Sequence, residues 1–261
     1  MRLAVSTDGK TIANSKIVPT PKVFENGIQQ IRQIANDLGS EKVDKIAGGI
    51  AGPLDRDKTM LIKSPHVSSW VDKPLKSELE TVFNCQVFLE NDTALVGLGE
   101  ATEGAGAGKN IVAYITVSTG VGGVRIVDGK IDKNSLGFEP GHQVILPNGD
   151  PCNCGGTGHL ETLVGGFYLE RTYKQKAENI KDPQVWHEVA RYLGLGLCNS
   201  IVHWSPDIVV LGGAVMKSVD LQKVKIYLKE YLTIFPHPPE VVLAKLDSDG
   251  GLYGALKLIA R

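Results

Sequence analysis

No uninterrupted apolar run in this sequence approaches the ~18 residues that a membrane-spanning helix needs. No apolar signal-peptide core follows the first Met. The charges nearly cancel, because 28 Lys and Arg face 29 Asp and Glu for a net charge of −1. Without a basic excess, nothing favours binding to nucleic acid or to a membrane surface. We therefore expect a protein that binds neither.

Cysteine is also scarce, since the 261 residues include only four, two of them in the pair Cys152-x-Cys154. This usage suits a reducing compartment better than a disulfide framework, so we expect a cytoplasmic protein. Glycine, in contrast, is abundant, because 30 residues exceed the average usage of ~7%. Many of them form Gly-Gly or Gly-x-Gly, which indicates backbone that approaches a ligand rather than disorder.

The segment from Glu139 to Glu161 has neither a helical nor a strand period and is rich in Gly, Pro and Asn. A loop of this length needs something other than a hydrophobic face to hold it. It carries four nitrogen or sulfur donors, which are His142, Cys152, Cys154 and His159. Zinc prefers such ligands, and ligation by four side chains marks a structural site. The alternative is two buried cysteines and two surface histidines without a metal, but the close spacing favours the metal.

Strands and helices alternate along the rest of the chain, which predicts an α/β protein. In order, we expect a hairpin over 2–18, a helix over 24–38, a strand over 45–51, a helix over 75–83, a strand over 87–89, a helix over 94–100, strands over 111–117 and 124–127, a helix over 186–204, a strand over 207–211, a helix over 221–232, a strand over 241–244 and a helix over 250–260. The similar order of the two halves suggests two related lobes with a cleft between them.

Asp92 lies where a predicted buried strand meets the start of a helix. Ligands of open α/β sheets bind at this edge. The positive end of the helix dipole would keep the carboxylate ionised, as a general base toward a hydroxyl requires. The alternative is that Asn91 or Asp92 only caps the helix, and the residues alone favour the cap.

Two glycine-containing turns also follow predicted strands. In the first, Thr116 to Gly123, backbone N–H groups and Thr119 could approach phosphate oxygens closely, but an ordinary hairpin loop is the alternative. The second, Gly212-Gly213-Ala214, could receive a nucleotide base or could be only a tight turn into a helix. Because these turns and Asp92 all follow strand ends, one cleft could collect them.

Seven segments resemble the ROK (repressor, open reading frame, kinase) family of sugar kinases and sugar-responsive repressors, in family order. They are SPHVSSW, ENDTALVGLGE, ITVSTGVGG, EPGH, CNCGGTGHLE, VVLGGAV and DGGLYGAL. The resemblance implies a two-lobed actin/hexokinase-like (ribonuclease H-like) α/β fold with a structural zinc loop. The expected small lobe covers 1–91 and is completed by 248–261. The expected large lobe covers 92–247 and contains the zinc loop 139–161.

The resemblance also implies a role for each candidate residue. Asp92 would be the base that takes a proton from a sugar hydroxyl. The other hydroxyls would be held by Asn91, Glu139, His142 and Glu161, with His142 also on the zinc. Ser118, Thr119 and Gly120 would face the ATP phosphates, and Gly212 and Gly213 the adenosine. The implied partners are a sugar, ATP with Mg²⁺, structural Zn²⁺ and a second copy of the chain in a homodimer.

Two features depart from the family pattern. The family motif CxCGxxGC ends in cysteine, whereas this chain has His159, which is also a competent zinc ligand. Family members open with a strand and a DxGGTK phosphate loop, whereas residues 2–21 match the hairpin that follows that loop. Asp8-Gly9-Lys10-Thr11 resembles the loop, but the nine residues from 12 to 20 are too few for the strand and hairpin that should intervene. We therefore predict a turn there, and a chain without the first phosphate loop and its Mg²⁺-facing carboxylate.

The leading hypothesis is ATP-dependent phosphorylation of a hexose or an N-acylhexosamine by a glucokinase-like kinase. The alternative is a catalytically weak or inactive sugar-binding relative, because the first phosphate loop is missing. A sugar-responsive repressor would need a DNA-binding helix-turn-helix before residue 1, and the sequence shows no such segment.

Overall fold

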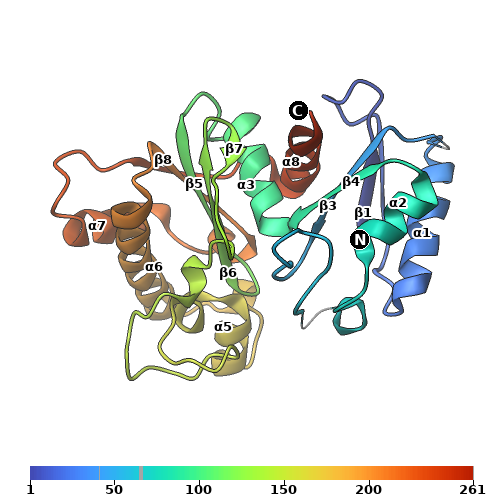
Figure 1. Ribbon diagram of the computed structural model, residues 1–261. Helices are drawn as coiled ribbons and strands as arrows, with labels where there is room; N and C mark the ends of the chain where they lie inside the picture. The colour runs from blue at the N-terminus through green and yellow to red at the C-terminus, as the bar shows by residue number, and fades with distance from the viewer. Residues whose placement is uncertain (41, 65–66, 261) are drawn as a thin grey trace. The chain divides into compact units, whose positions relative to one another are not determined.

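The computed structural model describes residues 1–40, 42–64 and 67–260 (Figure 1). Pro65 and His66 of the SPHVSSW segment lie outside the described residues. The chain forms two compact units, the first made of Met1–Glu103, Lys133–Gly137 and Ser248–Arg261, and the second of Gly104–Asp132 and Phe138–Asp247. The lobe boundaries expected from the sequence stay a proposal. The compact units differ from the expected lobes because they count residues 92–103, with the helix that starts at Asp92, and residues 133–137 with the first unit.

The first unit contains two small sheets and four helices among the described residues. Its elements are β1 (Arg2–Val5), β2 (Asn14–Ile17), α1 (Phe24–Asp37), β3 (Lys45–Ile50), the 3-10 turn η1 (Ser68–Trp70), α2 (Leu75–Phe83), β4 (Gln86–Asn91), α3 (Asp92–Thr102), the 3-10 turn η5 (Asp247–Asp249) at its border, and α8 (Gly250–Ile259). β3 and β4 run parallel, and Ile50 pairs with Asn91 at their carboxyl ends. β4 therefore leads directly into Asp92, the first residue of α3.

The tip of the first hairpin is a turn, as predicted. β1 and β2 pair antiparallel, with Arg2 opposite Ile17. The Asp8 carboxylate accepts hydrogen bonds from the backbone amides of Lys10 and Thr11 and from the Thr11 hydroxyl, each at 2.8 Å. These bonds, the backbone ones foremost, hold the pKa of Asp8 well below its usual range. Asp8 is therefore occupied by its own turn.

Glycines in the first unit allow two helices to touch along their backbones. A Cβ at Gly99 of α3 would lie 2.2 Å from the carbonyl oxygen of Gly250, and one at Gly254 of α8 would lie 1.8 Å from that of Leu95. Only glycine permits this approach. At these positions glycine therefore serves helix packing, which corrects the expectation that glycine clusters mark backbone near a ligand.

The second unit is built on a five-stranded mixed sheet in the order β7-β6-β5-β8-β9. Its strands are β5 (Ile111–Val117), β6 (Val121–Val127), β7 (Lys130–Ile131), β8 (Ile208–Gly212) and β9 (Glu240–Leu243). β5, β8 and β9 are parallel, and β6 returns antiparallel beside β5. The carboxyl ends of β5 and β8 therefore meet at one edge, where Thr116 pairs with Gly212.

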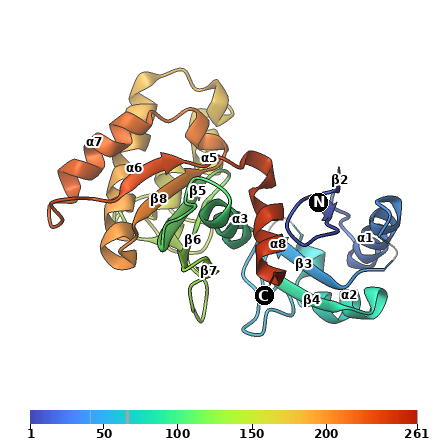
Figure 2. The same ribbon diagram turned by 90° about the horizontal axis from the view of Figure 1, so that it is seen from above.

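The helices of this unit are α4 (Leu160–Val164), α5 (Gly166–Tyr173), α6 (Pro183–Trp204) and α7 (Leu221–Tyr231), with 3-10 turns η2 (Pro140–His142), η3 (Ala177–Asn179) and η4 (Ala214–Lys217). Figure 2 shows α6 and α7 beside the sheet. Leu193 and Leu197 of α6 are fully buried in the same core as Ile115 of β5. The short helices α4 and α5 have no predicted counterpart, because Gly165-Gly166 interrupts their period. No helix in the described part of the chain is both long and apolar enough to cross a membrane.

Candidate functional site

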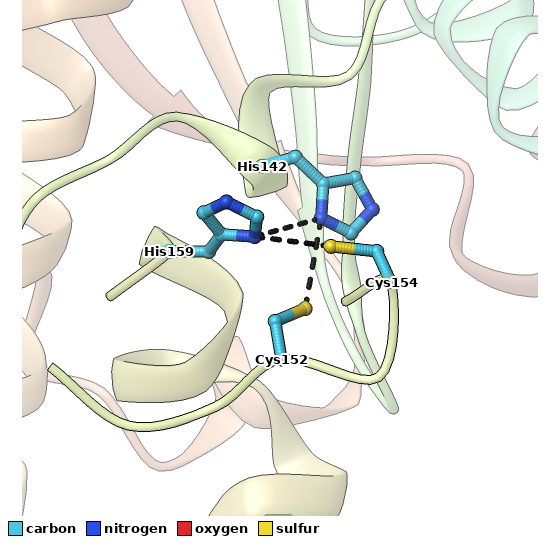
Figure 3. A group of neighbouring side chains, drawn as sticks. All are labelled: His142, Cys152, Cys154 and His159. Carbon is cyan, nitrogen blue, oxygen red and sulfur yellow. Dashed lines mark hydrogen bonds between the residues drawn. The ribbon is translucent and has the colours of Figure 1, made fainter. Parts of the chain in front are cut away.

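The four predicted metal ligands converge in the second unit (Figure 3). His142 ends the 3-10 turn η2, Cys152 and Cys154 lie in the loop that follows, and His159 stands at the N-cap position of α4. One ligand atom from each residue lies within 4.8 Å of all the others. Cys152 and His159 are buried, whereas Cys154 is exposed. The predicted ligand set is therefore assembled as a cluster.

Three of the six distances among these atoms match those around a zinc ion. Nδ1 of His142 lies 3.3 Å from Nδ1 of His159, which lies 3.4 Å from Sγ of Cys154. Sγ of Cys152 lies 3.8 Å from Nδ1 of His142. Tetrahedral zinc, with Zn–N of ~2.0–2.1 Å and Zn–S of ~2.3 Å, places its ligand atoms roughly 3.3–3.8 Å apart. Four side-chain ligands leave no open position, as in a structural site.

Backbone contacts close the loop on itself. Gly158 has a φ of 66°, and a Cβ there would lie 1.5 Å from the carbonyl oxygen of Leu146. The Gly158 carbonyl accepts the amides of Ile145 and Leu146 at 2.8 and 3.0 Å. Leu160 N–H donates to the Gln143 carbonyl at 3.0 Å. Because Gly158 precedes His159 directly, these bonds hold that ligand beside the η2 turn of His142.

Tyr168 of α5 contacts Cys152 of the cluster, and this contact was not predicted from the sequence. Its hydroxyl accepts the Asn153 amide at 2.8 Å and donates to Cys152 Sγ at 3.5 Å. Burial and then the bond to Cys152 raise the pKa of Tyr168 to about 12. No sequence signal separates it from other helical tyrosines, because its partner lies 16 residues away in an irregular loop.

We expect Tyr168→Phe to weaken zinc binding by about 10–100-fold, because hydrogen bonds to metal ligands orient them and tune their basicity. The measurement is zinc transfer to a competing chromophoric chelator, which requires no enzymatic activity. Tyr173→Phe is the matched control, since Tyr173 lies on the same helix and is 42% exposed. Equal zinc affinity of the two variants would show that the Tyr168 hydroxyl does not support the site.

The two glycine-containing turns meet at the edge formed by β5 and β8. The Ser118–Gly120 turn follows β5, and Gly213 follows β8 with a φ of 97°. A Cβ at Gly213 would lie 2.2 Å from the Val117 carbonyl oxygen, so glycine is required there. Among the described residues, none accepts a hydrogen bond from the amides of Thr119 and Gly120. The two turns can therefore present backbone donors at one edge of the sheet.

Glu161 joins the zinc loop to the first of these turns. It lies in the first turn of α4, and its Oε2 accepts the Val121 amide at 3.0 Å. A Cβ at Gly120 would lie 2.4 Å from the same oxygen. On the other side of the turn, the Ser118 carbonyl accepts the Gly166 amide at 2.7 Å. Glu161 therefore lies directly against the predicted phosphate turn.

Glu139 and His142 lie close to each other in the second unit. Oε2 of Glu139 lies 3.9 Å from Nε2 of His142, the ring nitrogen that does not face Cys152 and His159. The pKa of Glu139 is raised, mainly because the carboxyl group is desolvated. His142 lowers this pKa, and the nearby Glu161 carboxylate raises it. Three of the four predicted sugar-holding residues, Glu139, His142 and Glu161, are thus electrostatic neighbours in the second unit.

Asn91 and Asp92 belong to the first unit, where the structure decides which of them caps α3. Asn91 is the N-cap, because its Oδ1 accepts the Ala94 amide at 3.2 Å. Its Nδ2 donates to the Gly52 carbonyl at 3.2 Å. Asp92 is the first residue of α3, and its exposed side chain accepts the Thr93 amide at 2.7 Å. The capping alternative therefore applies to Asn91 and not to Asp92.

Known proteins resemble this chain over almost its entire length. The ROK family matches residues 1–261. A glucokinase from Thermotoga maritima is 29% identical over 297 aligned residues, which cover 98% of this chain and 92% of the relative. The crystal structure of a ROK hexokinase from Thermus thermophilus is 31% identical, with a TM-score of 0.84 over 96% of this chain and 91% of the other.

A ROK glucokinase from Streptomyces griseus, solved in complex with glucose and AMPPNP, is 27% identical. Its TM-score is 0.80, and the match covers 98% of this chain and 95% of that one. The predicted fold is thereby confirmed, and the His/Cys cluster is consistent with the zinc-binding motif of the family. The chain therefore belongs to the ROK family, has its actin/hexokinase-like α/β fold and is similar to its glucokinases.

Proposed function

We propose that this protein transfers the γ-phosphoryl group of ATP to a hydroxyl of a hexose or an N-acylhexosamine, as a glucokinase-like kinase. One observation carries most of the proposal: the Glu161 carboxylate accepts the Val121 amide directly beside the Ser118–Gly120 turn. A group that can hold a sugar hydroxyl is thus adjacent to a turn that can hold phosphates. Phosphoryl transfer depends mainly on this kind of positioning.

In this proposal Asp92 is the general base. Its carboxylate stands at the positive end of the α3 dipole, which favours the ionised form. It would take the proton of the sugar hydroxyl while the hydroxyl oxygen bonds to the γ-phosphorus and the bond to the bridging oxygen breaks, releasing ADP. Asn91, Glu139, His142 and Glu161 would hold the remaining hydroxyls. Gly212 and Gly213 would lie against the adenosine.

Asp8 belongs to the segment that resembles the family's phosphate loop, so it is the residue to test as a Mg²⁺ ligand. Mg²⁺ bound with ATP would screen the charge of the phosphates. Asp8 does not fit as its ligand, because four donors already occupy its carboxylate. This observation supports the second candidate function, a catalytically weak or inactive sugar-binding relative.

We infer that His142, Cys152, Cys154 and His159 hold a structural Zn²⁺. The two histidines would use Nδ1, as the distances indicate. With Nδ1 on a metal, neutral His142 carries its proton on Nε2 and can donate it to a sugar hydroxyl or to Glu139. The loop would thereby orient Glu139 and Glu161, which stand at its two ends.

The test is a coupled ADP-release assay with Mg-ATP over a panel of hexoses and N-acylhexosamines, run beside sugar binding by calorimetry. We expect turnover of at least one sugar. Binding without turnover would favour the inactive sugar-binding relative, and the absence of both would overturn both functions. Sedimentation analysis of the same sample tests the expected homodimer.

Gly120→Ala tests the contact between the phosphate turn and Glu161. The new methyl group would lie 2.4 Å from Glu161 Oε2, so the carboxylate or the turn must move. We expect kcat/KM to fall about 100-fold, as a displacement near 1 Å in a positioned site can cause. Gly251→Ala is the control, because its Cβ would meet only Val96 Cγ2 at 3.6 Å. Unchanged kcat/KM in Gly120→Ala would separate this turn from the reaction.

A further inference from the structure

An ion pair contains a buried carboxylate that lies two residues before the proposed base in the sequence. Lys58 Nζ binds Oε2 of Glu90, the next-to-last residue of β4. The Glu90 side chain is 9% exposed, whereas that of Lys58 is 41% exposed. The second oxygen, Oε1, accepts the backbone amide of Asn91 at 3.0 Å. Glu90 is therefore held between a cation and the backbone of the residue that precedes Asp92.

The turn that carries Lys58 holds its backbone in an uncommon conformation. Lys58 has a φ of 52°, in the left-handed region that residues with a Cβ rarely adopt. Asp55 holds this conformation, because its carboxylate accepts the amides of Thr59 and Met60 at 2.5 and 2.9 Å. Its carbonyl also accepts the Lys58 amide at 3.0 Å. Leu61, just beyond the turn, is fully buried in the core of the first unit and anchors it there.

The segment of residues 52–58 makes a second contact with the end of β4. Its Gly52 carbonyl accepts Nδ2 of Asn91 at 3.2 Å, while Asn91 Oδ1 caps α3. Residues 52–58 therefore contact Glu90 through the Lys58 side chain and Asn91 through the Gly52 backbone. Both contacts fall on the two residues that set the direction in which the chain enters Asp92.

We propose that the Lys58–Glu90 pair is a positioning device for phosphoryl transfer, which fixes the backbone of Asn91 and thereby aims the Asp92 carboxylate. The inference rests on the proposed role of Asp92 as the base. In this proposal both residues act through Asp92 and neither contacts the reacting atoms. The simpler alternative is that Lys58 only compensates a buried charge. Removing one partner would then be harmful, but removing both charges together would not.

The decisive variant is the double substitution Lys58→Met with Glu90→Gln, which removes the pair without leaving a buried charge unpaired. We expect it to fold, to lower kcat by about 10–100-fold as displaced catalytic groups do, and to leave the KM for ATP near its original value. The single variant Lys58→Arg keeps the cation and should retain most of the kcat of the original protein. The matched control is Lys73→Met with Glu25→Gln, an exposed pair in the same unit, which should leave kcat unchanged.

Amide hydrogen exchange supplies a readout that needs no turnover. We expect the Asn91 amide to exchange faster in the double variant, because the Glu90 carboxylate that accepts it has changed. Unchanged kcat in the double variant would overturn the positioning role, and so would unchanged exchange of its Asn91 amide. If the original protein binds sugar without turnover, the proposed kinase function fails separately. Unchanged exchange of the Asn91 amide in the double variant would then still overturn the positioning inference.

Discussion

Asp92→Asn is expected to lower kcat for sugar phosphorylation by about 10²–10⁴-fold while sugar affinity changes little. The amide has the shape of the carboxylate but cannot accept the proton of the sugar hydroxyl. Asn91 rather than Asp92 caps α3, so the helix should form normally in the variant. Loss of the charge at the helix start should cost only about 0.3–1 kcal/mol of folding free energy.

The assay compares kcat, the sugar dissociation constant and the unfolding temperature of Asp92→Asn with those of Asp44→Asn. Asp44 is an exposed aspartate of the same unit, and its substitution should change none of them. A collapse of kcat at nearly constant sugar affinity would identify Asp92 as the base. Retention of more than half of the original kcat would show that another group takes the proton.

Loss of zinc is expected to have the second large effect, on stability and on sugar binding together. Removing a ligand in Cys152→Ser should abolish stoichiometric zinc, because a structural site depends on its complete ligand set. The loop between Glu139 and Glu161 has little core of its own, so we expect it to lose its structure. Sugar affinity should then fall at least about 100-fold, since both glutamates would lose their positions.

Metal content, sugar calorimetry and hydrogen exchange over residues 139–161 test this expectation. Cys198→Ser is the matched control, because Cys198 lies in α6 outside the cluster and should leave zinc in place. His159→Cys should also retain zinc, since thiolate is an equally competent ligand. Zinc should be released as the pH falls, because protons compete for thiolates and imidazoles. Protein that contains no zinc and is insensitive to chelators would refute the metal assignment.

Much of the site was predictable because its ligands are close in sequence. The donors from His142 to His159 lie in one loop, and any compact path of that loop brings them near one another. The approximate strand ends near Asp92, Ser118 and Gly213 were equally predictable. Apolar strands and the helical period of their neighbours mark where each strand stops.

The contacts of single side chains were not predictable in this way. Lys58 and Glu90 are 32 residues apart, and their contact depends on how the 52–61 segment folds over the end of β4. Tyr168 meets Cys152 only because α5 starts against the Ser118 turn. The glycines of α3 and α8 suggested ligand contacts but proved to be packing sites, since glycine has the same sequence signature in either role.

The sequence by itself determined the family, the order of strands and helices, and the four residues of the His/Cys cluster. These follow from local period and from motifs, which short stretches of chain carry. Only the tertiary structure decided that Asn91, which also contacts Gly52, is the cap, and that Glu161 lies against the Ser118–Gly120 turn. Each of these outcomes depends on hydrogen-bond geometry, which is set when packed elements bring donors and acceptors within about 3 Å of one another.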